Sequence, residues 1–369
     1  MLTPEPTITD FTLPTLDARS LLRRAAVAVA LAGAALLAVL VLGGRVHAVA
    51  DALRRGLGVN PGWVSVGIAF ESVSLAGYVA LLALVAGRAT PRVRARESAQ
   101  ITLAGAAATR LLPTAGAGGA VLTLWALRRA GLPARAAGRT LLAFLVVLYA
   151  VFLSSIAVSG AVLALGLVSA SGPAAVSVIP AVAALLAIGV CLAFAIAQRG
   201  SARGGAGVVA GGVGGVGGGA AGARLVARVR GLAVPIGLAV HDACGLVRSG
   251  DRRLAGAIAY WAFDAGVLWA MLHAFGSPPV LPVLALAYLV GQVANTVPIP
   301  GSVSGGIAGV LIAFGVPADV ALPSVLAYRT VAVWLPTPVA MAAIPALRRT
   351  IARWEREDAA RATEPASAR

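Results

Sequence analysis

Two hydrophobic stretches of this chain are each interrupted at mid-length by the same pattern of proline and paired glycines. Pro113 is followed five residues later by Gly118-Gly119, and Pro300 is followed at the same distance by Gly305-Gly306. Proline interrupts a helix because it lacks an amide hydrogen and its ring clashes with the preceding turn. Interrupted apolar segments at corresponding places in two halves of a chain indicate a binding site inside a membrane.

The two halves also share three short motifs. The first is a Gly-X-Pro-Ala tetrapeptide after each interruption. The second is an acidic residue that follows Ala-Phe inside an apolar segment, and the third is an apolar pentapeptide that ends in an aromatic ring. The matched pairs are Gly131-Leu132-Pro133-Ala134 with Gly315-Val316-Pro317-Ala318, Ala69-Phe70-Glu71 with Ala262-Phe263-Asp264, and Thr140-Leu141-Leu142-Ala143-Phe144 with Ser324-Val325-Leu326-Ala327-Tyr328.

Composition identifies a polytopic membrane protein. Hydrophobic residues make up 59% of the 369 residues, and several runs approach or exceed the roughly 20 apolar residues that span a bilayer. The formal net charge is +16, and every basic residue other than histidine is an arginine. Most arginines flank hydrophobic runs, where topology signals and anionic lipid headgroups account for them. Because no basic stripe with interleaved aromatic residues occurs, we expect no nucleic-acid partner.

The N-terminal region has two interpretations. Residues 1–20 are polar and are predicted to form a disordered cytoplasmic tail, and Arg23-Arg24 precedes an apolar run over 25–44. Val46-His47-Ala48 would serve as a signal-peptide cleavage site, but the run and its leader are longer than usual, so a retained first span is favoured. The candidate membrane segments are 25–44, 63–86, 100–127, 140–168, 174–197, 254–273, 281–315 and 323–345.

The distribution of arginines between these segments predicts their topology. The stretches 87–99 and 128–139 each contain four arginines, so the positive-inside rule places both in the cytoplasm. Segment 100–127 must therefore enter the membrane and return. Segment 281–315 is flanked by the arginine-free stretches 274–280 and 316–322, so it is predicted to enter and return from the outer face.

The resulting prediction is an all-α polytopic membrane protein with six transmembrane helices and two opposed re-entrant helical hairpins, related as an inverted repeat. It lies in the plasma (inner) membrane with both termini in the cytoplasm. Within the linker, arginines alternating with apolar residues before Pro235 predict either an interfacial amphipathic helix or a solvated loop. The predicted regions are 21–197 for the first repeat and the first helix of the second, 198–253 for a cytoplasmic Gly-rich linker, 254–347 for the remainder of the second repeat, and 348–369 for a cytoplasmic tail.

Four ionisable residues fall inside the hydrophobic segments, namely Glu71, Arg110, Asp264 and Arg329. A charge at a helix centre costs about 2.5–3.5 kcal/mol on insertion scales, so these side chains should face the protein interior and pair. They either form salt bridges that fix helix packing or bind a ligand. In the second case Arg110 and Arg329 hold an anionic lipid headgroup, while Glu71 and Asp264 act as counter-charges or carry a coupled proton.

The residues around the two interruptions have structural and functional interpretations. Gln292 and Asn295 either satisfy backbone groups freed by Pro298 and Pro300 or add polar groups to a site. Glycines at the interruptions permit sharp turns and close backbone approach, which is compatible with tight helix packing. These glycines are Gly116, Gly118, Gly119, Gly301, Gly305 and Gly306.

Enzymatic chemistry finds little support in the sequence. The chain has no nucleophile elbow, no P-loop lysine and no histidine spacing typical of a metal site. Cys191 and Cys244 stand alone. We therefore predict a protein that is not an enzyme and needs no cofactor or metal, with an intramembrane transferase as the alternative.

The motifs of both hairpins resemble the lysylphosphatidylglycerol synthase transmembrane family, also called flippase-like domain proteins. The second hairpin carries the resemblance in Val297-Pro298-Ile299-Pro300-Gly301 and, further on, Ala327-Tyr328-Arg329 and Trp334-Leu335-Pro336. The first, from Arg110-Leu111-Leu112-Pro113 to Gly131, resembles an actinobacterial branch. The resemblance implies a protein that moves lipids between leaflets. The chain departs from the family because its second hairpin lacks an acidic residue and no soluble lysyltransferase domain follows.

The favoured function is translocation of a phospholipid or polyprenyl-linked lipid, with anionic membrane lipids as partners. Two alternatives stay open, a non-transporting accessory protein of a cell-envelope lipid pathway and a transporter of small anions. A second copy of the chain or an envelope enzyme would be a further partner. A groove open sideways to the bilayer is expected of a lipid translocase, and an enclosed aqueous site of an anion carrier.

Overall fold

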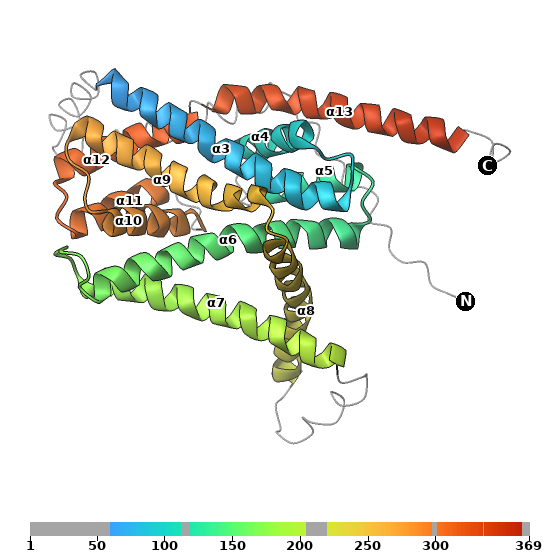
Figure 1. Ribbon diagram of the computed structural model, residues 1–369, viewed down its shortest axis with the longest axis horizontal. Helices are drawn as coiled ribbons and strands as arrows, with labels where there is room; N and C mark the ends of the chain where they lie inside the picture. Colours follow the sequence, from blue (N-terminus) through green and yellow to red (C-terminus); the bar gives the residue numbers. More distant parts are fainter. Residues whose placement is uncertain (1–59, 112–117, 204–219, 297–300, 335, 364–369) are drawn as a thin grey trace. The chain divides into compact units, whose positions relative to one another are not determined.

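The computed structural model describes residues 60–111, 118–203, 220–296, 301–334 and 336–363 (Figure 1). Side chains are described for all of these except 110–111, 198–203 and 220–233. The predicted tail over 1–20 and the first span over 25–44 lie outside the described residues. So do Pro113 and Gly116 of the first interruption, and Pro298 and Pro300 of the second.

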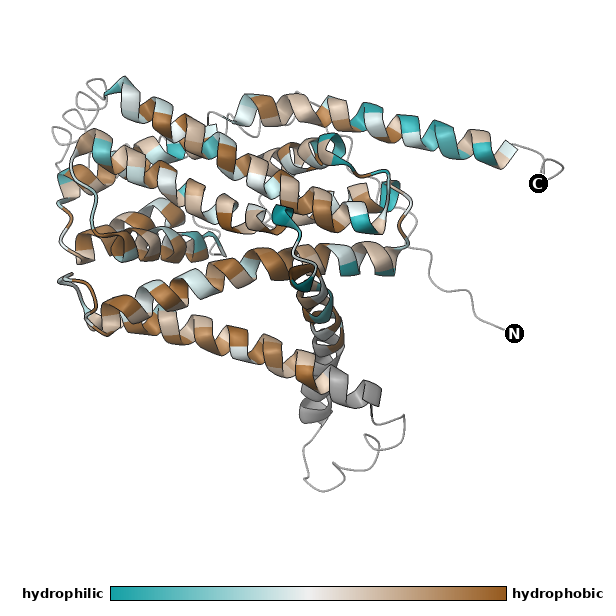
Figure 2. Cartoon of the chain, in the orientation of Figure 1, coloured by the Kyte–Doolittle hydropathy of each residue, from teal (hydrophilic) through white to brown (hydrophobic). Residues whose placement is uncertain are grey.

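All regular secondary structure in the described ranges is helical, and five stretches are long and apolar enough to cross a membrane. Figure 2 shows apolar residues along most of the length of the first four of these stretches, whereas the last one ends in a hydrophilic segment. The prediction of an all-α membrane protein is thus confirmed. The five are α3 (Pro61–Ala89), α6 (Ala134–Ala164), α7 (Ala174–Arg203), α9 (Ala255–Phe275) with the 3-10 turn η1 (Arg252–Leu254), and the stretch Ala318–Thr363, which contains α12 (Ala318–Arg329), the π-helical turn η3 (Thr330–Trp334) and α13 (Thr337–Thr363).

Each predicted interruption separates two short helices that pack against each other. The first pair is α4 (Ala95–Leu111) with α5 (Gly118–Arg129). The second is α10 (Leu281–Val293), extended by the 3-10 turn η2 (Ala294–Thr296), with α11 (Ser302–Ala313). We call these pairs hairpin 1 and hairpin 2. Their open ends lie at opposite ends of the long helices (Figure 1).

Glycines allow the two backbones of each hairpin to touch. A Cβ atom on Gly118 would lie 2.8 Å from the carbonyl oxygen of Ala108, and one on Gly119 would lie 2.9 Å from Oγ1 of Thr109. In hairpin 2, a Cβ on Gly306 would lie 3.1 Å from Cα of Gly291. Tight packing through small residues is therefore the role of Gly118, Gly119 and Gly306.

Gly305 departs from this pattern, because a Cβ there would meet no atom within 4 Å. The predicted close backbone approach is therefore wrong for Gly305. This glycine lies on the face of α11 that points away from α10, whereas its neighbour Gly306 packs against α10. Gly301, which precedes α11, has φ of 85°, a left-handed conformation that favours glycine. It provides the sharp turn that was predicted for it.

The two Gly-X-Pro-Ala motifs form the same turn. Gly131 and Gly315 have φ values of 94° and 85°. In the first turn the amides of Gly131 and Leu132 donate to the carbonyls of Arg128 and Leu127. In the second, the amides of Gly315 and Val316 donate to Ile312 and Leu311. Both are Schellman caps that end a hairpin, and the following proline precedes the first residue of the next long helix.

Helices α3 and α9 form the closest crossing between long helices. A Cβ on Gly77 would lie 2.7 Å from the carbonyl oxygen of Gly256, and one on Gly256 would lie 2.3 Å from that of Gly77. Ser74 donates its hydroxyl to the carbonyl of Tyr260 at 2.9 Å. Further along, Phe70 and Phe263 stack edge to face with their ring centroids 5.4 Å apart. These phenylalanines belong to the matched Ala-Phe-acid motifs.

Two predicted segments differ from the structure in outline. The span over 323–345 is interrupted, since α12 ends at Arg329 and α13 begins at Thr337 after the π-helical turn. Pro336, directly before α13, accounts for the break because it cannot donate a backbone hydrogen bond to the preceding turn. In the linker, α8 (Ala220–Arg248) continues through Pro235, so the helix is found there and the loop alternative is not.

The α3–α9 crossing generates a stability prediction. Gly77→Ala places a methyl group against the backbone of Gly256, and we expect it to lower the free energy of unfolding by about 1–3 kcal/mol. Gly189→Ala in α7 is the matched control, since a Cβ there meets no atom within 4 Å. It should be neutral or stabilising by up to about 1 kcal/mol. Unfolding in mixed micelles titrated with SDS measures both, and equal effects would contradict the crossing.

Candidate functional site

A groove of about 950 Å³ lies between α6, α9 and α10, with Phe70 of α3 at its edge. One wall is aromatic, formed by Trp261, Phe263 and Trp269 of α9 together with Tyr288 of α10. Trp261 is held in place because its Nε1 donates to the carbonyl of Leu148 in α6 at 2.9 Å. The lining residues include no charged side chain.

Three serines of α6 supply hydroxyl groups to the groove. Ser154, Ser155 and Ser159 line it next to Val151, Val158 and other aliphatic residues. A serine hydroxyl in a helix can donate to a carbonyl of the preceding turn, so these serines add polar atoms to the wall without adding charge. The groove therefore suits a ligand part that is long, uncharged and mostly hydrocarbon.

Asp264 lies next to the groove in a hydrogen-bonded cluster of three helices. Tyr288 of α10 donates its hydroxyl to Oδ2 of Asp264 at 2.7 Å, and Tyr328 of α12 donates to Oδ1 at 3.0 Å. Nε2 of Gln292 in α10 donates to the Tyr328 hydroxyl at 3.0 Å. We call these four residues the Asp264 cluster. Its bonds tie α9, α10 and α12 together in the part of the protein where polar groups are most costly.

Glu71 of α3 is the second acidic residue in this region. It is buried, and both it and Asp264 act electrostatically on Tyr260 and Tyr328. The structure thus brings the two matched acids into one neighbourhood, beside the Phe70–Phe263 contact. The surroundings of the two differ, because Phe144 occupies the position matched with Tyr328 and cannot donate a hydrogen bond.

The structure describes the side chain of only one of the two predicted arginines. Arg329 is half-buried at the C-terminal end of α12, adjacent to Tyr328 and outside the set of residues that line the groove. Arg110 lies one residue before the end of α4, and its side chain is outside the described part of the protein. The prediction that both arginines face one cavity stays a prediction.

The other predicted polar residues separate into two groups. Gln292 belongs to the Asp264 cluster, whereas Asn295 is exposed in η2. Thr296 donates to the carbonyl of Val293 at 2.8 Å, which satisfies backbone near the end of α10. Tyr288 was missed because a single tyrosine in an apolar run gives no motif. Its sequence signal would have been a hydroxyl one turn before Gln292 on the same helix face.

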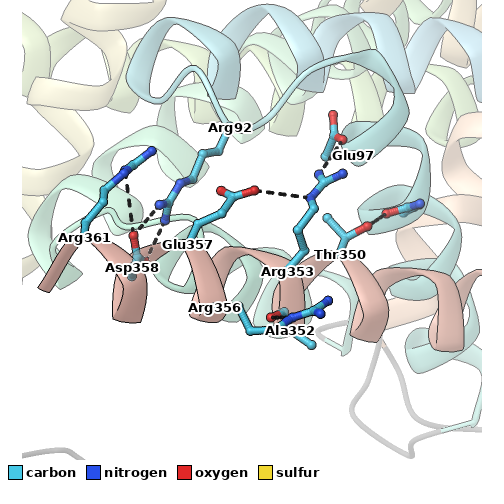
Figure 3. Close-up of polar contacts among 10 residues, drawn as sticks. Arg92, Glu97, Thr350, Ala352, Arg353, Arg356, Glu357, Asp358 and Arg361 are labelled. Atoms are coloured by element: carbon cyan, nitrogen blue, oxygen red, sulfur yellow. Dashed lines mark hydrogen bonds and ion pairs between the residues drawn. The ribbon is translucent and has the colours of Figure 1, made fainter. Parts of the chain in front are cut away.

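A separate group of ion pairs binds α13 to hairpin 1 and to the loop before it (Figure 3). Arg92 donates through both terminal nitrogens to the carboxylate of Asp358, and this hydrogen bonding raises the pKa of Arg92. Arg353 lies 3.6 Å from Glu97 and 3.7 Å from Glu357. Much of the predicted tail over 348–369 is therefore a docked helix, and Trp354 within it is only 2% exposed.

Comparisons with known proteins add no relative. No protein-family model matches the chain, and no curated protein matches it. The resemblance to the flippase-like family consequently stays a prediction. Within the described ranges, no three His, Cys, Asp or Glu side chains are grouped so as to hold a metal ion.

The ion pairs on α13 generate a prediction about its docking. Arg92→Ala should loosen the turns after Trp354 and speed tryptic cleavage at Arg356 and Arg361, because the bidentate contact with Asp358 is lost. High salt should have a similar effect on the wild type, since exposed pairs are screened. Arg349→Ala, an exposed substitution one turn before Arg353, should leave the rate of cleavage at Arg356 and Arg361 unchanged. Identical digestion of both variants would show that the pairs do not hold the helix.

Proposed function

We propose that the chain is a lipid-binding membrane transporter that moves a phospholipid or polyprenyl-linked lipid between leaflets and performs no enzymatic reaction. The groove between α6, α9 and α10 is the observation that carries this proposal. Its volume of about 950 Å³ is at the upper end of the range of about 300–1,000 Å³ typical of ligand pockets. Its aromatic and aliphatic lining matches hydrocarbon chains.

The absence of charge from the groove lining separates two candidate ligands. A small soluble anion would need donors or cations around it, whereas the lining residues offer only hydroxyl and indole groups. We therefore favour a lipid whose chains occupy the groove and whose headgroup lies beyond it. Arg329 and Arg110 are the proposed contacts for an anionic headgroup, with Glu71 and Asp264 as counter-charges.

The proposed architecture has six spans, with 25–44 as the first, and hairpins 1 and 2 entering the membrane from opposite faces. The matching Schellman caps at Gly131 and Gly315 support an internal repeat. The Phe70–Phe263 and Gly77–Gly256 contacts support an inverted one, because the matched helices α3 and α9 run antiparallel. We place the protein in the plasma membrane with both termini in the cytoplasm.

Tryptophan fluorescence tests the groove directly, because Trp261 and Trp269 line it. In vesicles of phosphatidylcholine, phosphatidylglycerol with brominated acyl chains should quench this emission. Ala285→Phe fills the groove and should raise the mole fraction of quencher needed for half-maximal quenching by about fivefold or more. The same variant should slow the transfer of headgroup-labelled phosphatidylglycerol between leaflets.

Two controls make the quenching experiment specific. Ala183→Phe adds the same ring on the exposed face of α7 and should behave as the wild type. The Trp261→Phe/Trp269→Phe variant should lose the quenching component that Ala285→Phe affects. If the tryptophan emission of Ala285→Phe and Ala183→Phe is quenched at the same mole fraction of brominated lipid, lipid chains do not occupy the groove and the proposed function is wrong.

Topology is tested by single cysteines in a chain with Cys191 and Cys244 replaced by alanine. Ser171→Cys and Ser277→Cys lie in arginine-free loops, whereas Ala95→Cys lies among arginines at the start of α4. An impermeant maleimide should label the first two in intact cells and the third only after permeabilisation. Labelling of Ala95→Cys from outside would contradict the proposed orientation of hairpin 1.

A further inference from the structure

Tyr288 connects the groove to the Asp264 cluster. Its ring packs edge to face on Trp261 of the groove wall, with the ring centroids 6.3 Å apart, and its hydroxyl donates to Oδ2 of Asp264 at 2.7 Å. The side chain is fully buried, so the ring cannot move without changing either the wall or the hydrogen bond. A change at Asp264 is therefore also a change in the groove.

The directions of the hydrogen bonds in the cluster depend on the charge of Asp264. An ionised carboxylate only accepts, which fits the two tyrosine hydroxyls that both point to it. A protonated carboxyl group donates one bond, and its hydroxyl oxygen is a weaker acceptor than a carboxylate oxygen, so the tyrosine bond to that oxygen is weakened. Tyr328 is additionally held by Gln292, whereas the Tyr288 hydroxyl bonds only to Asp264 among the described residues. Tyr288 is thus the contact more easily lost.

Other charged and titratable groups surround Asp264 on the helices packed against α9. Glu71 adds a second carboxylate from α3, and Arg329 follows Tyr328 on α12. Tyr260 lies one turn before Asp264 on α9 itself, and Tyr149 of α6 interacts electrostatically with Tyr260. A proton taken up by this region reduces the repulsion between two carboxylates that share the same tyrosine neighbours.

We propose that Asp264 is a proton-binding site whose protonation is linked through Tyr288 to occupancy of the groove. This inference rests on the proposed function, since it names the ion coupled to lipid binding. A hydronium ion transfers its proton to one carboxylate oxygen, so one O–H bond breaks in hydronium, one forms at Asp264, water is released, and the hydrogen bond from Tyr288 is lost. We assign the groove with its Tyr288–Asp264 bond to the ionised form, so a lipid that fits it binds that form. By linkage, bound lipid lowers proton affinity at Asp264 by the same factor.

The linkage predicts a sign for the pH dependence. Acidification should weaken lipid binding, because it removes the bond that holds Tyr288 in the groove wall. From about pH 8 to about pH 5, half-maximal quenching by brominated phosphatidylglycerol should require about fivefold more quencher or higher. Asp264→Asn should be independent of pH and close to the acid value of the wild type. Tyr288→Phe keeps the ring and should also lose the pH dependence.

Matched variants separate this linkage from a general effect of acid. Tyr78→Phe removes a hydroxyl from a partly buried ring that packs on Phe144 and Tyr260, and it should keep the pH dependence of the wild type. Glu71→Gln should keep at least part of it. Infrared difference spectra give a second readout without lipid. The carbonyl band of a protonated carboxylic acid should appear on acidification in the wild type and be reduced in Asp264→Asn.

The outcomes distinguish the two proposals. Quenching that is absent from the groove at every pH would overturn the proposed function, and the linkage with it. Groove quenching that does not depend on pH would overturn the linkage alone. The linkage alone would also be overturned if Asp264→Asn retained the pH dependence of quenching while Glu71→Gln abolished it. It would likewise be overturned if Tyr288→Phe kept the pH dependence, as Tyr78→Phe is expected to do.

Discussion

The backbone contact between α3 and α9 at Gly77 and Gly256 is the constraint on which the polar centre depends. Helices in a bilayer gain little from burying apolar surface against each other, so close packing of small residues has to hold them together. This crossing brings Phe70 against Phe263 and places Glu71 and Asp264 in one neighbourhood. It also leaves another face of α9 free to line the groove with Trp261 and Trp269.

In the proposed re-entrant arrangement, the hairpins solve a different problem of the same environment. Short helices that stop within a membrane expose unpaired backbone groups, which are tolerated only where protein or a cavity covers them. Glycines at the contacts between α4 and α5 and between α10 and α11 let each helix cover its partner. Hairpin 2 carries the additional task of presenting Tyr288 and Gln292 to α9 and α12, whereas hairpin 1 receives α13 on its outer face.

Local patterns predicted much of this arrangement. The Gly-X-Pro-Ala motifs became matching caps, and the glycine pairs marked the hairpins, because these features act through backbone geometry within a few residues. The Asp264 cluster was beyond reach, since Tyr288, Gln292 and Tyr328 meet only after two helices fold against α9. The docking of α13 was missed for a similar reason. In the sequence its charged residues are typical of a solvated tail, and their partners Arg92 and Glu97 lie beside them only in the folded protein.

The interruption between α12 and α13 divides one membrane crossing between two structural bodies. α12 packs with α9 and α11 and carries Tyr328 of the Asp264 cluster, whereas α13 packs along α4 and is fixed there by Trp354 and its ion pairs. The π-helical turn and Pro336 separate these two sets of contacts, so the Asp264 cluster and the ion pairs of α13 lie on different helices of one apolar stretch.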